Sequence, residues 1–185
     1  KNEYDRAGHG TRVAGIIAAK FNPENHVQGV APNAELYIYK MSNNSLNTRD
    51  GLSSGLNYLR EQAVKVINIS ITCEHAYYVH AEIENAFKQG ITLVAAAGNS
   101  GQEDLTEPID AEYPAYYKET IAVGATNGRY ERISYSSYGE RLDLVAPGYL
   151  INSTSIRNYS IKSGTSFSTP IVTGLAALLK GQEPS

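Results

Sequence analysis

Apolar residues recur every three or four positions in four segments of the chain, which is the spacing of one buried face of an α-helix. In the first segment, Val13, Ile16 and Ile17 lie on one such face. The pattern predicts helices at residues 9–20, 50–62, 81–88 and 165–180. His9 is therefore expected at the start of a helix.

Shorter segments are rich in β-branched residues and are bounded by turn-forming residues, as strands are. The pattern predicts strands at residues 34–41, 64–71, 91–97, 120–125, 142–145 and 151–154. Segment 91–97, ITLVAAA, is almost wholly apolar, which is typical of a parallel sheet covered by helices on both faces. Helices and strands alternate over the first half of the chain, so we predict an α/β fold with a mainly parallel central sheet.

Composition and charge narrow the function classes. The chain has 185 residues, of which 42% are hydrophobic, and this suits one domain over residues 1–185. A formal net charge of −3 leaves no basic face for nucleic acid, and the apolar stretches are far shorter than the roughly 20 residues that span a membrane. We therefore expect no nucleic-acid partner and no membrane span. The single cysteine, Cys73, excludes an intrachain disulfide and leaves the compartment open.

Three segments that contain glycine carry residues suited to chemistry. They are GHGT at residues 8–11, AGNSG at 97–101 and SGTSFSTP at 163–170. A serine hydroxyl needs a base to take its proton, and histidine is the usual base, so Ser166 and His9 could act together. The Asn99 amide and the Ser166 backbone N–H could then stabilise an oxyanion. Each segment alone also has a structural interpretation as a turn or a helix cap.

Eight short motifs occur in a fixed order along nearly the whole chain. They are HGTRVAG at 9–15, GVAP at 29–32, VINIS at 66–70, AAAGN at 95–99, YPA at 113–115, IAVGA at 121–125, APG at 146–148 and SGTSFSTP at 163–170. Together they resemble the subtilase family of serine peptidases. The resemblance implies a three-layer α/β/α subtilisin-like fold. It also implies a serine endopeptidase that forms an acyl-enzyme on Ser166, with His9 as general base and Asn99 in the oxyanion hole.

The resemblance also implies where a polypeptide substrate binds. An extended peptide would pair with the edge of one strand, and a neighbouring segment would line the pocket for the residue before the cut. The residues implied are Ser70, Ile71 and Thr72 for the strand, and Ala96, Ala97 and Gly98 for the pocket. Where the family has two glycines after this strand, this chain has Thr72 and Cys73. Their side chains predict a narrower pocket and a restricted choice of residue before the cut.

The triad aspartate of the family lies on a strand well upstream of the histidine, but only eight residues precede His9 in this sequence. Asp5 falls in the variable loop that leads into the histidine helix, so it is not expected to orient the imidazole. The aspartates that follow His9 match no triad motif; they are Asp50, Asp104, Asp110 and Asp143. One interpretation is an excerpt of a longer enzyme, which lacks the first strand and the last helix of the fold and is nearly inactive alone. The other is an inactive binding or scaffold module of the same fold. The resemblance favours a secreted or cell-surface protein, with a propeptide as a further partner of the full-length enzyme.

Two further expectations come from the resemblance. Many members bind calcium in the loop after the histidine helix, where Asn22, Glu24 and Asn25 offer oxygen ligands. A solvated turn explains the same residues, and no other metal or cofactor is implied. Phe167 follows Ser166, where many members have an oxidisable methionine.

Overall fold

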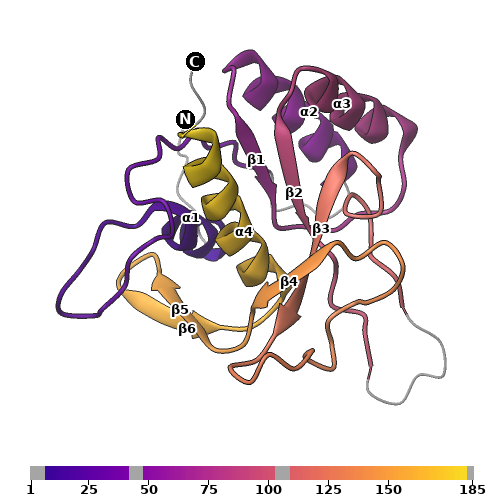
Figure 1. Cartoon of the computed structure of the whole chain (residues 1–185). Helices are drawn as coiled ribbons and strands as arrows, with labels where there is room; N and C mark the ends of the chain where they lie inside the picture. Colours follow the sequence, from indigo (N-terminus) through magenta and orange to yellow (C-terminus); the bar gives the residue numbers. More distant parts are fainter. Residues whose placement is uncertain (1–6, 42–47, 103–108, 183–185) are drawn as a thin grey trace.

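The computed structural model describes residues 7–41, 48–102 and 109–182. In these ranges a parallel sheet with the strand order β1-β2-β3-β4 forms the centre (Figure 1). Its strands are β1 (Val66–Ile69), β2 (Thr92–Ala96), β3 (Thr120–Thr126) and β4 (Leu144–Pro147). The helices are α1 (His9–Ala18), α2 (Thr48–Glu61), α3 (Tyr77–Lys88) and α4 (Thr165–Lys180), and β5 (Ile151–Thr154) pairs with β6 (Tyr159–Lys162) in an antiparallel hairpin.

Helices cover both faces of the sheet, so the fold has three layers. Helix α4 crosses all four strands on one face, and α1 packs against α4 (Figure 1). On the other face, residues of α2 and α3 share one core cluster with β1 and β2. The predicted α/β/α architecture is therefore confirmed.

Strand β2 is apolar after its first residue, Thr92, and its packing shows why. Leu93 and Ala95 are buried in the cluster beneath α2 and α3, whereas Val94 packs with Val123 and with Val172 of α4 on the other side. Successive strand residues face opposite sides of a sheet. Because both sides are covered here, the four buried positions after Thr92 are all apolar.

Most predicted elements are present, with shifted ends. Helix α3 begins at Tyr77, four residues before the predicted start. The sequence pattern does not predict this first turn because the turn contains two tyrosines, which favour strand conformations. Strand β6 was not predicted, since its four residues, YSIK, carry no apolar alternation that separates them from a turn.

The prediction of a strand at residues 34–41 is wrong. This segment has no strand pairing among the described residues, and several of its apolar side chains are exposed, Ile38 by 64%. A cavity of about 600 Å³ lies between it and residues 64–71, which include β1 at the end of the sheet. A strand forms only where its backbone has a partner to pair with. The alternating pattern is present in the sequence, but the cavity separates the segment from the sheet.

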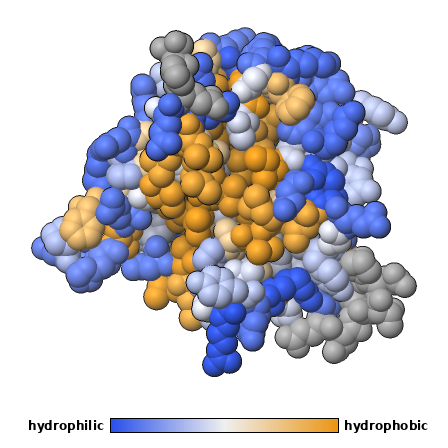
Figure 2. Space-filling view, in the orientation of Figure 1, coloured by the Kyte–Doolittle hydropathy of each residue, from blue (hydrophilic) through white to orange (hydrophobic). Residues whose placement is uncertain are grey.

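A second apolar surface lies on the outer side of α4. Figure 2 shows hydrophobic residues gathered over this part of the molecule. The exposed residues are Leu175, Leu178 and Leu179 of α4 and Leu144 and Val145 of β4. Contiguous apolar surface of this kind is typical of a face that another element or partner covers. No helix within the described ranges has the length and apolar character needed to cross a membrane.

Candidate active site

Ser166 is the second residue of α4 and therefore lies at the N-terminal end of this helix. Gly164, just before the helix, has a φ of 145°, a backbone conformation that side-chain-bearing residues rarely adopt. The Ser166 hydroxyl donates a hydrogen bond to the Ser70 carbonyl at 3.2 Å, and the Ser70 hydroxyl donates to the Ser166 carbonyl at 2.8 Å. This reciprocal pair fixes the start of α4 to the residue that follows β1.

Pro170 explains why the Ser166 carbonyl is available to Ser70. In an α-helix the carbonyl of residue 166 would accept the N–H of residue 170, and proline has no N–H. Pro170 lies inside α4. The Ser70 hydroxyl donates to this carbonyl in place of the missing N–H. Because of Pro170, the Ser166 carbonyl is therefore bonded to the residue that follows β1.

Asn68 and Thr173 extend the same contact. The Thr173 hydroxyl of α4 lies 2.8 Å from the Asn68 side-chain oxygen, and the Asn68 amide donates to the Ser70 hydroxyl at 3.0 Å. Sequence reasoning did not assign these two residues to the site. The VINIS motif contained Asn68, but only the fold places Thr173, two turns along α4, beside it.

Asn99 is anchored to the start of α4 by its side-chain oxygen. That oxygen accepts hydrogen bonds from the Thr165 backbone N–H at 3.0 Å and from the Thr165 hydroxyl at 3.2 Å. The side-chain amide nitrogen therefore remains as a donor beside the helix N-terminus. The first N–H groups of a helix have no acceptor within the helix, and the Ser166 N–H is one of them. Two donors thus lie near the start of α4, where the helix dipole favours negative charge.

His9 reaches this place from a third element. It is the first residue of α1 and is half-buried. Its ring lies 5.6 Å from the ring of Phe167, the residue after Ser166, at an interplanar angle of 53°. His9 also lines the cavity beside β1. The structure therefore places the starts of α1 and α4 and the residues after β2 close together.

The residues predicted to bind substrate form two adjacent segments. Ser70, Ile71 and Thr72 continue the line of β1, with Ser70 buried and the other two half-buried. Ala96 ends β2, Ala97 and Gly98 follow it, and all three are buried. Because β1 and β2 are parallel neighbours, the two segments lie side by side on the carboxyl edge of the sheet.

Residues 112 and 113 connect the ends of the two segments. The Cys73 N–H donates to the Tyr113 carbonyl at 2.8 Å, and the Glu112 N–H donates to the Ala97 carbonyl at 2.7 Å. The Cys73 thiol is half-buried, and this burial raises its pKa. A raised pKa leaves little reactive thiolate at neutral pH, which favours a structural role for this cysteine over a reactive one.

The loop predicted to bind calcium uses its first candidate ligand for internal contacts. The Asn22 side-chain oxygen accepts from the Glu24 N–H at 2.9 Å, and its amide donates to the Tyr159 hydroxyl of β6 at 2.8 Å. The first bond is typical of a turn closed by an Asn side chain, and the second ties the loop to β6. Calcium binding at Asn22, Glu24 and Asn25 stays a prediction.

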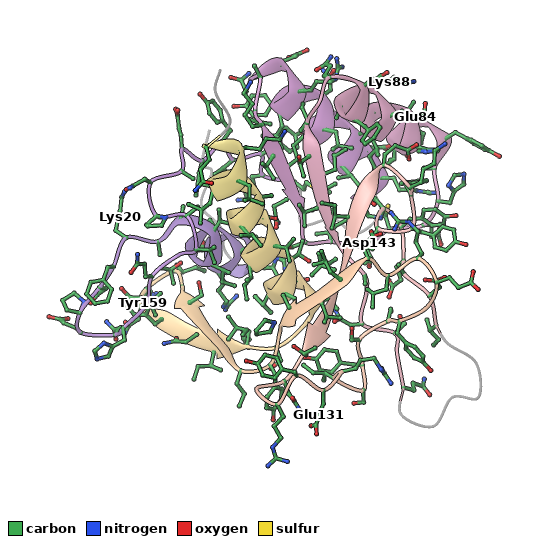
Figure 3. The ribbon with its side chains drawn as sticks, in the orientation of Figure 1. Lys20, Glu84, Lys88, Glu131, Asp143 and Tyr159 are labelled. Carbon is green, nitrogen blue, oxygen red and sulfur yellow. The ribbon has the colours of Figure 1, made fainter. Side chains whose placement is uncertain are left out.

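A different group has the residue types of a metal site. Ligand atoms of His80, Glu84 and Glu119 lie within 4.8 Å of one another. His80 lies 3.1 Å from the buried Glu119 carboxylate, and Glu84 lies 3.4 Å from Lys88 one turn along α3 (Figure 3). Hydrogen bonding between His80 and Glu119 and the ion pair of Glu84 with Lys88 thus give each of the three side chains a partner within the protein. The sequence shows the i, i+4 spacing of His80 and Glu84, but only the fold adds Glu119.

Arg141 holds together the loop that precedes β3. Its guanidinium donates to the backbone carbonyls of Tyr116, Tyr117 and Thr120, and it lies 2.7 Å from the Asp143 carboxylate, labelled in Figure 3. The side chain is only 18% exposed. One cation thus satisfies three carbonyls close to the residues 112 and 113 described above.

Arg141→Met is expected to lower the free energy of unfolding of the full-length protein by about 2–3 kcal/mol, since several carbonyls lose a charged donor. Urea denaturation followed by circular dichroism measures this. Arg129→Met is the matched control, because Arg129 is exposed and such surface changes usually stay within about 0.5 kcal/mol. Equal effects of the two substitutions would contradict the role given to Arg141.

Comparison with known proteins is consistent with this arrangement. The model of the subtilase family matches residues 1–185. Subtilisin DY from Bacillus licheniformis is 40% identical over 184 residues, which cover 98% of this chain and 66% of that protein. An alkaline protease from Alkalihalobacillus alcalophilus is also 40% identical, over 98% of this chain and 47% of that protein.

Among solved structures, the S41 psychrophilic protease superposes with a TM-score of 0.85 at 31% identity, covering 98% of this chain and 65% of that one. The chain thus spans less than two thirds of the length of each of these three relatives. Since the family model matches every residue, the chain belongs to the subtilase family.

Proposed function

We propose that the full-length protein is a serine endopeptidase that hydrolyses peptide bonds through an acyl-enzyme on Ser166. The observation that carries this proposal is the meeting of Ser166, the Asn99 amide and His9 at the start of α4. The relatives that resemble the chain are named as proteases. A hydroxyl, a base and two oxyanion donors in one place are what acyl transfer requires.

Each residue has a defined role in the proposed reaction. The Ser166 hydroxyl turns from the Ser70 carbonyl toward His9, which takes its proton as the oxygen attacks the substrate carbonyl carbon. The Asn99 amide and the Ser166 N–H donate to the resulting oxyanion. His9 then gives the proton to the leaving amine, and water releases the acyl group from Ser166 by the same steps.

The substrate is proposed to bind as an extended strand beside residues 70–72, with the residue before the cut toward residues 96–98. Main-chain hydrogen bonds would supply affinity in this mode, and side-chain pockets would supply specificity. The parallel, adjacent course of the two segments supports this placement.

We propose that the triad aspartate comes from a segment upstream of Lys1 that pairs with β1. The cavity of about 600 Å³ beside β1 is lined by His9 on one side and by residues 34–41 on another. A strand there would pair with the exposed edge of β1 and could place a carboxylate against the His9 ring, fixing its orientation. Asp5, the alternative acid, lies outside the described residues.

Residues 1–185 expressed alone are expected to aggregate, because the edge of β1 and the apolar side chains at residues 34–41 are left uncovered. The full-length protein is expected to be monodisperse. Size-exclusion chromatography with light scattering compares the two. A soluble, monodisperse monomer of residues 1–185 would contradict the idea that an upstream strand fills the cavity.

Phe167→Met is expected to make the enzyme sensitive to hydrogen peroxide, because it introduces an oxidisable sulfur beside His9 and the nucleophile. The 185-residue sequence has one methionine, Met41, which lines the cavity. Residual hydrolysis after peroxide treatment measures the effect, with Met41→Leu as the control. Rapid inactivation of the Met41→Leu protein by oxidation near residue 167 would show that the expectation is wrong.

Labelling with a fluorophosphonate tests the proposed function. The full-length protein should form a covalent adduct, and both Ser166→Ala and His9→Ala should abolish it. A folded full-length protein that does not label would refute the serine-peptidase proposal and favour a binding or scaffold module of the same fold.

A further inference from the structure

The candidate substrate pocket has an acidic residue at its far end. Residues 70–73 form one wall, residues 96–98 form the other, and residues 112 and 113 join them by hydrogen bonds to Ala97 and Cys73. We infer that Glu112 selects lysine or arginine as the residue before the cut. This inference rests on the proposed function and names its substrate class.

Glu112 is directed into the space that Gly98 leaves open. A Cβ atom at Gly98 would overlap the Glu112 carboxylate, so the carboxylate lies directly against this glycine. Gly98 also has a φ of 109°, which favours glycine. The next residue is Asn99, the proposed oxyanion donor. The carboxylate therefore lies against the residue that directly precedes the proposed oxyanion donor.

The charge of Glu112 is not neutralised by the described part of the protein. Its Oε1 accepts a hydrogen bond from the Ser100 hydroxyl at 2.9 Å and lies 3.5 Å from the Ser137 hydroxyl, and both groups are neutral. Among the described residues, no lysine, arginine or histidine nitrogen lies within 4.0 Å of this carboxylate. Glu112 is half-buried, where a missing counter-charge matters more than it does in open water.

The position of the reacting carbonyl links Glu112 to one substrate residue. The attacked carbon must lie between the Ser166 hydroxyl and Asn99, and the peptide extends along residues 70–72. The side chain of the substrate residue before the cut then enters between residues 70–73 and residues 96–98 and points to residues 112 and 113. Lysine and arginine are long, unbranched and cationic, so they can pass between walls narrowed by Thr72 and Cys73 and pair with the carboxylate.

The experiment uses the full-length protein and peptides that differ only in the residue before the cut, namely Arg, Lys, Leu, Phe or Glu. Wild-type kcat/KM is expected to be highest for Arg and Lys. Glu112→Gln should lower kcat/KM for these two peptides by roughly 10- to 150-fold, the range of a charged hydrogen bond, and change the value for Leu little. Glu112→Asp should retain part of the preference because it keeps the charge. Glu140→Gln, at an exposed site, is the matched control and should change none of the values.

Two results would overturn the inference while the proposed function stands. One is a wild-type enzyme that labels with fluorophosphonate but prefers Leu or Phe. The other is an equal loss for all peptides in Glu112→Gln, which would indicate a structural role for Glu112. A folded protein that neither labels nor hydrolyses any peptide would overturn the inference and the proposed function together.

Discussion

Ser166→Ala is expected to lower kcat of the full-length protein by roughly 10⁶-fold, a value carried over from subtilisin, where loss of the serine or histidine of the triad has that effect. The hydroxyl is the only group that forms the acyl-enzyme in the proposed reaction. Its neighbours hold the helix start in place through Ser70 and Asn99. The substitution removes the nucleophile but keeps the backbone contact from Ser70 to the residue 166 carbonyl.

Hydrolysis of a chromogenic peptide, with the enzyme at high concentration, measures this loss. His9→Ala should lower kcat to a similar extent, and the double variant should be little worse than either single variant, because the two residues act as one unit. Thermal unfolding of each variant checks that the protein remains folded. A loss of less than about 100-fold in folded Ser166→Ala would mean that another group is the nucleophile.

Asn99→Leu is expected to lower kcat by about 10²- to 10³-fold with little change in KM, the magnitude known for the corresponding donor in subtilisin. The Asn99 amide is proposed to bind the oxyanion, which exists only in the transition state and the tetrahedral intermediate. An interaction of that kind changes kcat and leaves substrate binding nearly unchanged.

Asn99 also has a structural role, because its side-chain oxygen accepts two hydrogen bonds from Thr165. Asn99→Asp serves as the matched variant, since it keeps the acceptor for Thr165 while it replaces the amide donor with a carboxylate that repels the oxyanion. Asn99→Asp should therefore lose at least as much kcat as Asn99→Leu. A loss in Asn99→Leu that Asn99→Asp restores would assign the effect to anchoring of α4 and contradict the oxyanion role.

Much of this site could be predicted because its chemistry is contained in short segments. The HGT, AGN and SGTS segments each carry their functional side chain at the end of a helix or strand. In a parallel α/β fold, the residues after the strands and before the helices gather at one edge of the sheet. The motifs and the fold class together therefore placed His9, Asn99 and Ser166 near one another.

Other features depend on contacts between distant segments and could not be predicted. Asn68 meets Thr173 only because α4 crosses β1. Glu112 reaches the pocket only because residues 112 and 113 bond to both walls. Residues 34–41 show the opposite case, in which a strand-like local pattern forms no strand, because the cavity separates this segment from β1 and no described strand pairs with it.

Mass spectrometry of the full-length protein after fluorophosphonate treatment determines directly whether Ser166 is the nucleophile. We expect one adduct per molecule, located on the proteolytic peptide that contains Ser166 and prevented by prior incubation with a peptide-aldehyde inhibitor. An adduct on another residue, or none on folded protein, would contradict the assignment of Ser166 as the nucleophile.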